Sequence, residues 1–333
     1  MPAPDPTVSV VVPVYNKRSF ILSCMACLRS QTFTDFEVVV VDDGSTDGSP
    51  DSVRPCLTER DQLITQPNCG CGPARNTGIA AARGRYIAFF DADDEWDPDY
   101  LATMVGLLTE YPEAGMAACA TRSLDDVKME HRTVELLPPG SQAGLVHDYL
   151  RRCAAACLFD PHPSSVTIPK AVLDDVGGWQ PVRYQEDCDL YVRIGCKYPV
   201  AYTTRPLHSY RRNVSGSIMS TVPPTRPPFV EATEERLRRG AVPPDKVRVV
   251  RGLCCAYLLL YAKWLHEYGR WREARAAARE AVRGFGLPPR RAWPWLAGVL
   301  APPWLTGVAH ELVRCTRRIR AGRRQSADEG APD

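Results

Sequence analysis

The sequence has no strong excess of charge, few cysteines and no internal repeat. Its 41 basic and 39 acidic side chains leave a formal net charge of +2, and 44% of its 333 residues are hydrophobic. This composition excludes an intrinsically disordered chain, because such chains combine high net charge with few apolar residues. Thirteen cysteines in this length are too sparse for a disulfide scaffold, and an odd number cannot pair completely within one chain.

The N-terminal segment also lacks the features of a secretory signal. Residues 1–7 contain neither a basic segment nor an apolar one. We therefore expect a cytoplasmic, reducing setting in which thiols stay free. Cys24 and Cys27 have the CxxC spacing of zinc ligands, but no second pair of matching spacing follows. Buried thiols are the simpler interpretation of these two residues.

The small net charge conceals an asymmetry along the chain. Residues 1–229 contain 21 basic and 28 acidic side chains, whereas residues 230–333 contain 20 and 11. Segments of opposite charge usually have different partners. Four prolines lie within residues 223–228, which is typical of a linker. The sequence therefore predicts an N-terminal domain over 1–222, a proline-rich linker over 223–229, a helical region over 230–325 and a flexible tail over 326–333.

The first hundred residues alternate short apolar runs with helical patterns. The runs at 8–14, 36–41, 63–65 and 86–90 are rich in β-branched or aromatic residues, and helical patterns lie at 19–29, near 50–60 and at 74–83. Such alternation predicts βαβ connections in a parallel sheet with helices on both faces, an α/β fold. Beyond it we expect helices at 100–111, 187–194, 246–268 and 271–285 and strands at 116–120 and 163–168; residues 125–165 show no clear period.

Polar residues follow the predicted strands, where parallel sheets bind their ligands. Asp91 and Asp93 follow the fourth run. On an extended segment they would point to the same side and could share a hard cation with a diphosphate, or they could belong to a solvated acidic loop. Asp42 and Asp43 follow the second run. They could accept hydrogen bonds from a base or ribose, or form a turn.

Further candidate side chains lie near these runs. Tyr15 follows the first run and could stack on a base, or it could be a partly buried tyrosine at a strand end. Arg75 lies at the start of a helical pattern; it could reach a phosphate or be a plain surface arginine. Glu186 and Asp187 open another helical pattern, and taken alone they fit N-terminal capping as well as catalysis.

The order of these motifs is more specific than any one of them. The chain reads VVPVYN from position 11, VVDDGS from 40, GPARNTGI from 72, YIAFFDADD from 86, VGGW from 176 and QEDCDL from 185. Over residues 7–215 it thereby resembles the inverting nucleotide-sugar glycosyltransferases of family 2, which have the GT-A fold. The resemblance implies a nucleotide-binding half over 1–99 and an acceptor-binding half over 100–222.

The resemblance also implies roles for the motif residues. Asp187 would be the general base, with Glu186 beside it, and Asp93 together with Asp91 would hold Mn²⁺ or Mg²⁺ on the diphosphate. The nucleotide would contact Pro13, Tyr15, Asp42, Asp43, Arg75, Asp91 and Ala92. The donor would be a nucleotide-diphospho-sugar, with UDP favoured, and the acceptor a hydroxyl of a glycan, a lipid-linked intermediate or a small molecule.

One departure from the family pattern concerns the end of the catalytic region. Family members often have a tyrosine-arginine pair followed by a histidine near the metal or diphosphate. Here Tyr210-Arg211-Arg212 is followed by Asn213, and the nearby histidine is His208. His208, Arg212 or Asn213 could replace the contact of the family histidine. Two other functions stay open on the sequence. One is a nucleotide-sugar-binding subunit without turnover, and the other is a nucleotidyltransferase, for which no glycine-rich triphosphate loop is visible near the N-terminus.

The basic C-terminal region has its own candidate partner. Residues 292–309 form an 18-residue stretch without charge, long enough to suggest a membrane span, but its prolines argue against a spanning helix. Tryptophans between arginine clusters over 290–324 fit a peripheral contact with anionic lipid at the inner face of a membrane. A helical cap on the catalytic domain is the alternative. No recognition motif accompanies the arginines, so we expect no nucleic-acid partner.

Overall fold

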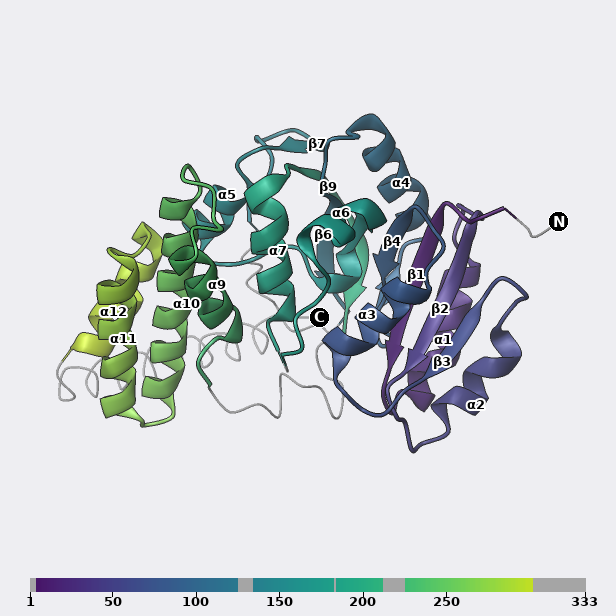
Figure 1. Ribbon diagram of the computed structural model, residues 1–333, viewed down its shortest axis with the longest axis horizontal. Helices are drawn as coiled ribbons and strands as arrows, with labels where there is room; N and C mark the ends of the chain where they lie inside the picture. The colour runs from purple at the N-terminus through teal and green to yellow at the C-terminus, as the bar shows by residue number, and fades with distance from the viewer. Residues whose placement is uncertain (1–3, 125–133, 183, 212–224, 302–333) are drawn as a thin grey trace, which may run out of the picture.

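The computed structural model (Figure 1) describes residues 4–124, 134–182, 184–211 and 225–301. A nine-stranded sheet has the order β3-β2-β1-β4-β8-β6-β9-β5, with β7 paired to β9. Its strands are β1 (Val8–Val14), β2 (Phe36–Asp42), β3 (Gln62–Thr65), β4 (Tyr86–Phe89), β5 (Glu95–Trp96), β6 (Met116–Ser123), β7 (Ala143–Val146), β8 (Val166–Pro169) and β9 (Val200–Tyr210).

The four N-terminal strands confirm the expected parallel arrangement. Val8 of β1 lies opposite Phe36 of β2 on one side and Tyr86 of β4 on the other, and β3 pairs in parallel with β2. These strands read as nearly continuous apolar runs because helices cover both of their faces. Their carboxyl ends meet at one edge of the sheet, where Tyr15, Asp42, Asp43 and Asp91 lie.

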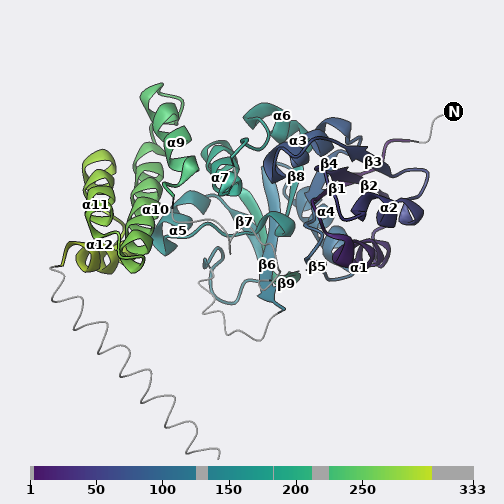
Figure 2. The same cartoon turned by 90° about the horizontal axis from the view of Figure 1, so that it is seen from below.

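Alternate residues of β1 point to opposite faces of the sheet and pack in two separate hydrophobic cores. Val8, Val10 and Val12 pack in the cluster that includes the apolar residues of α1 (Arg18–Arg29) and α4 (Tyr100–Glu110). Val11 packs on the opposite face with α3 (Cys71–Ala81), as the period of two in a strand requires. Figure 2 shows these helices on opposite sides of the sheet. The expected α/β architecture with helices on both faces is therefore confirmed.

The second half of the sheet is mixed. Strand β8 runs antiparallel to β4, β6 runs antiparallel to β8, and β9 is parallel to β6. The sequence did not predict β5, β7, β9 or α5 (Tyr149–Ala156). β7 and α5 are short and lie in the region without a clear period, which gives weak signals. The strand expected at 163–168 begins as a 3₁₀ turn over Pro163–Ser165 and becomes β8 only at Val166.

Other helices match the expected positions more closely. Helix α7 (Glu186–Lys197) contains the expected 187–194, whereas α6 (Lys170–Val176) before it was not predicted. The helix expected near 50–60 is shorter, with α2 (Ser49–Val53) followed by a 3₁₀ turn over Arg54–Cys56. Pro55 lacks the backbone N–H that would continue the α-helix, and a loop follows it, so α2 stays short.

The C-terminal region is helical, as expected. It comprises α9 (Pro228–Arg238), α10 (Val247–Glu267), α11 (Trp271–Phe285) and the short α12 (Trp293–Leu300). Apolar residues of α10 and α11 share one continuous core with α5, α7 and β8, and Figure 1 shows these helices stacked beside α5 and α7. The domain boundaries stay a prediction; the expected linker over 223–229 has only residues 225–229 within the described ranges.

None of the helices in the described ranges is both apolar enough and long enough to span a bilayer. The short α12 lies within the uncharged stretch over 292–309. Residues 302–309 of that stretch, and the arginines between 314 and 324, lie outside the described residues.

A buried carboxylate connects the sheet domain to the C-terminal helices. Asp189 on α7 is 1% exposed, accepts a hydrogen bond from Arg193 at 2.8 Å between Oδ2 and Nε, and forms a second ion pair with Arg236 on α9. Charged side chains are seldom buried unless they are paired. This pairing therefore fixes the position of α7 relative to α9.

We expect Asp189→Ala to lower the free energy of unfolding by about 3 kcal/mol, because two arginines lose their buried partner. Urea denaturation followed by circular dichroism measures the change. Asp245→Ala removes an exposed acid 3.8 Å from Lys246 and should change stability by less than about 0.5 kcal/mol. Equal effects of the two substitutions would show that Asp189 does not connect the two parts.

Candidate active site

The loops that follow β1 and β2 are held together by side-chain hydrogen bonds. Asn16 has a left-handed backbone with φ of 53°, and its Oδ1 accepts a hydrogen bond from the Thr46 N–H at 2.8 Å. Ser45 Oγ accepts one from the Asn16 N–H at 3.0 Å. Tyr15 lies between Pro13 and this junction and is 49% exposed, so its ring has a free face at the edge of the sheet.

Asp42 and Asp43 are buried and build the loops around them. Asp42 Oδ1 accepts a hydrogen bond from the Ser45 N–H at 3.1 Å, which is the turn interaction that the sequence left open. Asp43 accepts hydrogen bonds from the backbone N–H groups of Cys69 at 2.9 Å and Gly70 at 2.8 Å. Asp43 thereby fixes the loop that leads into α3, and its proposed contact with a base stays a prediction.

Residues 91–94 form a turn, which corrects the expected extended segment. The Asp94 N–H donates to the Asp91 carbonyl at 3.0 Å, and the Asp91 N–H donates to Ser164 Oγ at 3.1 Å instead of extending β4. Asp91 and Asp93 therefore have different cationic partners, and Ala92 between them is buried. Asp91 Oδ1 lies 2.8 Å from Arg75 Nη2, and Asp93 Oδ2 lies 2.6 Å from Lys17 Nζ.

Arg75 connects the two halves of the candidate site. Its guanidinium donates to Asp91 Oδ1 through Nη2 and to Glu186 Oε1 through Nη1, both at 2.8 Å. The side chain is 1% exposed, and its guanidinium carbon lies 4.5 Å from the ring centre of Trp179. The planar fork of arginine can bind two carboxylates at once. The buried Nε–H has no hydrogen-bond partner among the described residues.

Close backbone packing brings α3 to this position. A Cβ on Gly72 would lie 2.6 Å from the Gln180 carbonyl oxygen, and a Cβ on Gly178 would lie 2.3 Å from Asn76 Oδ1. Asn76 also exchanges two hydrogen bonds of 2.8 Å with the backbone of Trp179. The loop before α7 is therefore fastened to α3, which places Glu186 within reach of Arg75.

The carboxyl groups around Arg75 differ in their pKa values. Burial acts to raise the pKa of Asp91, but the Arg75 guanidinium outweighs it and the pKa is lowered. Burial and the neighbouring Glu186 raise the pKa of Asp187 to about 6. Asp187 keeps some exposed surface, so a hydroxyl group can reach it. Two acids with pKa values pushed apart are typical of sites that divide proton transfer from charge stabilisation.

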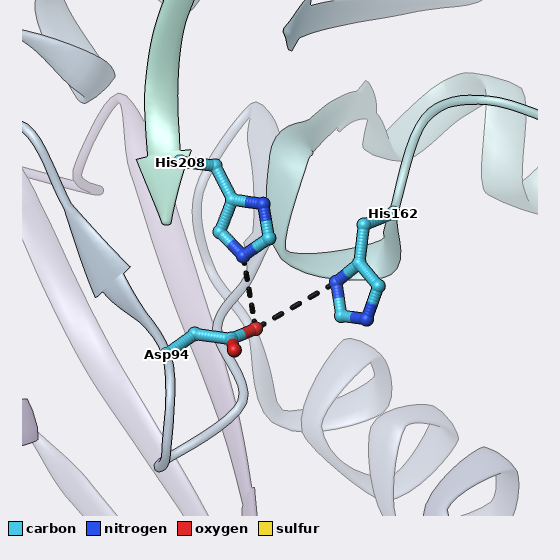
Figure 3. A group of neighbouring side chains, drawn as sticks. All are labelled: Asp94, His162 and His208. Carbon is cyan, nitrogen blue, oxygen red and sulfur yellow. Dashed lines mark hydrogen bonds and ion pairs between the residues drawn. The ribbon is translucent and has the colours of Figure 1, made fainter. Parts of the chain in front are cut away.

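A second cluster lies beside the acidic turn. Asp94, His162 and His208 offer ligand atoms within 4.8 Å of one another, and Figure 3 shows both imidazoles directed at one carboxylate. Asp94 Oδ2 lies 2.9 Å from His208 Nε2 and 3.6 Å from His162 Nδ1. The other nitrogen of His208 lies 3.0 Å from Thr121 Oγ1. The cluster joins β9, the turn before β5 and the 3₁₀ turn over Pro163–Ser165.

The electrostatics of this cluster suit metal ligation. Burial raises the pKa of Asp94 to about 7 and lowers that of His208 to about 3, and burial also lowers the pKa of His162. The contact between Asp94 and His208 is therefore a hydrogen bond between a carboxyl group and a neutral imidazole, and not an ion pair. Neutral imidazoles bind divalent metals, and an outer hydrogen bond such as that from Thr121 orients the ring. Two imidazoles and a carboxylate suit a divalent transition metal.

The sequence reasoning missed several residues of the site. His162 lies in the region without a clear period. Lys17 follows the VVPVYN motif and Trp179 ends the VGGW motif, but no local pattern reveals their contacts. His208 was considered as the substitute for the family histidine, and the structure places it against Asp94. Arg212 and Asn213 lie outside the described residues.

Part of the chain matches a known family model. Residues 9–155 match the family model described as glycosyl transferase family 2. Succinoglycan biosynthesis protein ExoO of Rhizobium meliloti is 39% identical over 141 residues, 42% of this chain and 39% of that protein. An uncharacterized glycosyltransferase of Nostoc, alr2836, is 30% identical over 193 residues, 55% of this chain and 58% of that protein. The chain thus spans less than two thirds of either relative.

Two solved structures share the fold. Residues 1–349 of TarS from S. aureus, in complex with UDP-GlcNAc, align with a TM-score of 0.61 and 18% identity over 84% of this chain and 90% of that chain. The mannosyltransferase PcManGT from Pyrobaculum calidifontis, in complex with GDP-Man and Mn²⁺, aligns with a TM-score of 0.56 and 24% identity over 93% of this chain and 82% of that chain. These likenesses confirm the expected GT-A fold.

We expect Arg75→Met to destabilise the fold by about 3–5 kcal/mol, because Asp91 and Glu186 lose a buried cation. Arg75→Lys should recover only part of this loss, since an ammonium lacks the fork that reaches both carboxylates. Urea denaturation measures both variants, and Arg85→Met, at an arginine whose guanidinium lies over the ring of Tyr86, serves as the control. Full stability of Arg75→Met would contradict the bridging role.

Proposed function

We propose that the chain is an inverting glycosyltransferase, and the match of residues 9–155 to the model of glycosyl transferase family 2 supports this proposal. It moves a sugar from a nucleotide-diphospho-sugar to an acceptor hydroxyl by a single displacement. The observation that carries the proposal is the Arg75 bridge, because it joins Asp91 of the donor-side motif to Glu186 of the acceptor-side motif. Residues 1–222 form the catalytic domain in this proposal.

The donor side is formed by the edge of the sheet. Tyr15 offers an exposed ring on which a base can stack, with Pro13 before it and Asp42 and Asp43 in the neighbouring loop. We favour a UDP-sugar. The bound UDP-GlcNAc of TarS supports this choice, whereas the GDP-Man of PcManGT shows that the same fold accepts another base.

A divalent cation, Mn²⁺ or Mg²⁺, is proposed at Asp93 with Asp91 beside it. The metal would supply Lewis-acid stabilisation of the departing diphosphate. Carboxylate oxygens suit such hard cations. In the structure the ammonium of Lys17 pairs with the carboxylate of Asp93. The cluster of Asp94, His162 and His208 is the second candidate for the metal, favoured by its convergent geometry. The Mn²⁺ bound to PcManGT supports a metal in this fold.

Asp187 is the proposed general base. It accepts the proton of the acceptor hydroxyl while the acceptor oxygen bonds to the anomeric carbon and the bond from that carbon to the diphosphate breaks on the opposite face. The raised pKa of about 6 lies closer to neutral pH than the usual pKa of an aspartate. A base whose pKa is near the working pH accepts a proton more effectively. Glu186 is held by Arg75 and positions the start of α7.

We also propose that the enzyme acts in the cytoplasm and contacts the inner face of a membrane through residues 290–324. Within the described part of this range, Arg290 and Arg291 are exposed and Trp293 is 45% exposed. Cationic residues next to an exposed tryptophan suit an interface with anionic lipid. A lipid-linked acceptor would then be within reach, although glycan and small-molecule acceptors are equally compatible with the site.

We expect Asp187→Asn to lower the transfer rate by at least about 10²-fold, the usual contribution of a positioned base. Donor binding should be unchanged, as measured by the thermal shift that UDP-sugars produce. In the wild type the rate should rise with pH and level off above an apparent pKa of about 6, because only the ionised carboxylate accepts a proton.

Asp174→Asn, at an exposed acid on α6, is the matched control and should retain the wild-type rate. Near-normal turnover by Asp187→Asn would show that Asp187 is not the general base. Donor binding without any transfer in the wild type would favour the non-catalytic subunit, and release of pyrophosphate from a nucleoside triphosphate would favour a nucleotidyltransferase.

Titration with Mn²⁺, followed by electron paramagnetic resonance without donor, separates the two metal candidates. We expect Asp93→Asn to weaken Mn²⁺ binding at least about tenfold, and His162→Ala to leave it nearly unchanged. The reverse pattern would assign the ion to the cluster of Asp94, His162 and His208. No change in either variant would contradict both assignments.

A further inference from the structure

We propose that Lys17 competes with the divalent cation for Asp93, and that its ammonium exchanges this carboxylate for the diphosphate when the donor binds. Metal and donor then bind cooperatively. This inference rests on the proposed glycosyltransferase function, and it describes how one residue of the chain regulates the donor site.

The ammonium of Lys17 lies at the carboxylate that would hold the cation. Its Nζ is 2.6 Å from Asp93 Oδ2. Lys17 is the N-cap residue of α1, and its backbone N–H donates to Ser49 Oγ at 3.0 Å. The ammonium also lies 5.6 Å from the ring centre of Phe20, within the range of a cation–π contact. The backbone of Lys17 is therefore held in place, while its side chain reaches across to the acidic turn.

Asp93 has a partner that can be released more easily than the partner of Asp91. Arg75 is buried and pairs with both Asp91 and Glu186. The side chains of Lys17 and Asp93 are 21% and 18% exposed, and Asp93 has no second ion pair among the described residues. A pair that is open to solvent contributes little to stability. Lys17 can therefore leave Asp93 without breaking another ion pair.

A metal ion at Asp93 and the ammonium of Lys17 exclude each other. Both need the oxygen atoms of one carboxylate, and like charges a few ångströms apart repel each other. Because Lys17 belongs to the same chain, the fold sets its effective concentration at Asp93. In the absence of donor, Lys17 therefore lowers the affinity of this carboxylate for a metal.

A nucleotide diphosphate removes this conflict, because its negative charge offers the ammonium another partner. Lysine binds phosphate groups as a compact charge on a flexible stem, which can move while the backbone stays in place. Lys17 follows the end of β1, at the edge of the sheet where the diphosphate is proposed to lie. Once Lys17 has moved, Asp93 can hold the cation, so each ligand strengthens the binding of the other.

The neighbouring Arg18 provides a matched control, because it carries the same charge on the same helix but has other partners. Its backbone N–H donates to Asp47 Oδ2 at 2.9 Å, and its Nη1 donates to the Asp47 carbonyl at 3.4 Å. Arg18 is exposed and contacts the loop after β2 instead of the acidic turn. Its removal therefore changes the net charge without freeing Asp93.

The first measurement uses the full chain and Mn²⁺ without donor, followed by electron paramagnetic resonance. We expect Lys17→Met to bind Mn²⁺ about tenfold more tightly than the wild type, because the competing charge is gone. A gain in affinity cannot come from a misfolded variant. Lys17→Arg and Arg18→Met should show no such gain, and neither should Lys17→Met combined with Asp93→Asn.

Three results of this titration would overturn the proposal. They are an unchanged or weaker affinity of Lys17→Met for Mn²⁺, an equal gain in Arg18→Met, and a gain that persists when Asp93 is replaced.

The second measurement is the affinity for UDP by calorimetry, in EDTA and in saturating Mn²⁺. We expect Lys17→Met to bind UDP like the wild type in EDTA and about tenfold more weakly in Mn²⁺. The factor equals that of the first measurement because the coupling between two ligands is reciprocal. Equal UDP affinities of the variant and the wild type in Mn²⁺ would show that Lys17 does not move to the diphosphate, and would overturn the proposal.

Failure of this inference and failure of the proposed function give different results. If Mn²⁺ strengthened UDP binding equally in the wild type and in Lys17→Met, the donor site would stand without this role for Lys17. If the wild type bound no UDP in either condition, the proposed donor site itself would fail, and the inference with it.

Discussion

The ion pairs of Arg75 are the interaction on which the rest of the site depends. A guanidinium that is almost fully buried would be unstable without compensation, and Asp91 and Glu186 supply it from opposite parts of the chain. Removing charges from water is costly, so the arrangement persists only if all three groups are in position together. The fold therefore couples the turn after β4 to the start of α7, and any displacement of one element breaks a contact of the other.

The C-terminal helices belong to this arrangement through their own polar contacts. Asp189, one turn after the acidic start of α7, pairs with Arg236 of α9, while Tyr257 of α10 lies against Cys188. Residues of the C-terminal helices therefore pack against the segment of α7 that carries Asp187. This explains why a helical region that carries no family motif still bears on the chemistry proposed for the sheet domain.

Charge compensation around the acidic turn follows one pattern. Asp91 is paired with Arg75, Asp93 with Lys17, and Asp94 with two neutral histidines. Adjacent carboxylates repel one another, and a turn separates them so that each finds its own partner. The same turn leaves Asp93 partly accessible, where a cation and a diphosphate could exchange with the ammonium of Lys17.

The sequence by itself determined the order of the motifs, the four parallel strands and the α/β class, because strand and helix periods are local properties of the backbone. It also indicated that Asp91, Asp93, Glu186 and Asp187 belong to the site. Only the tertiary structure decided how these residues pair. The partners of Arg75 and the cluster with His162 depend on packing between distant segments, and no local pattern encodes such contacts.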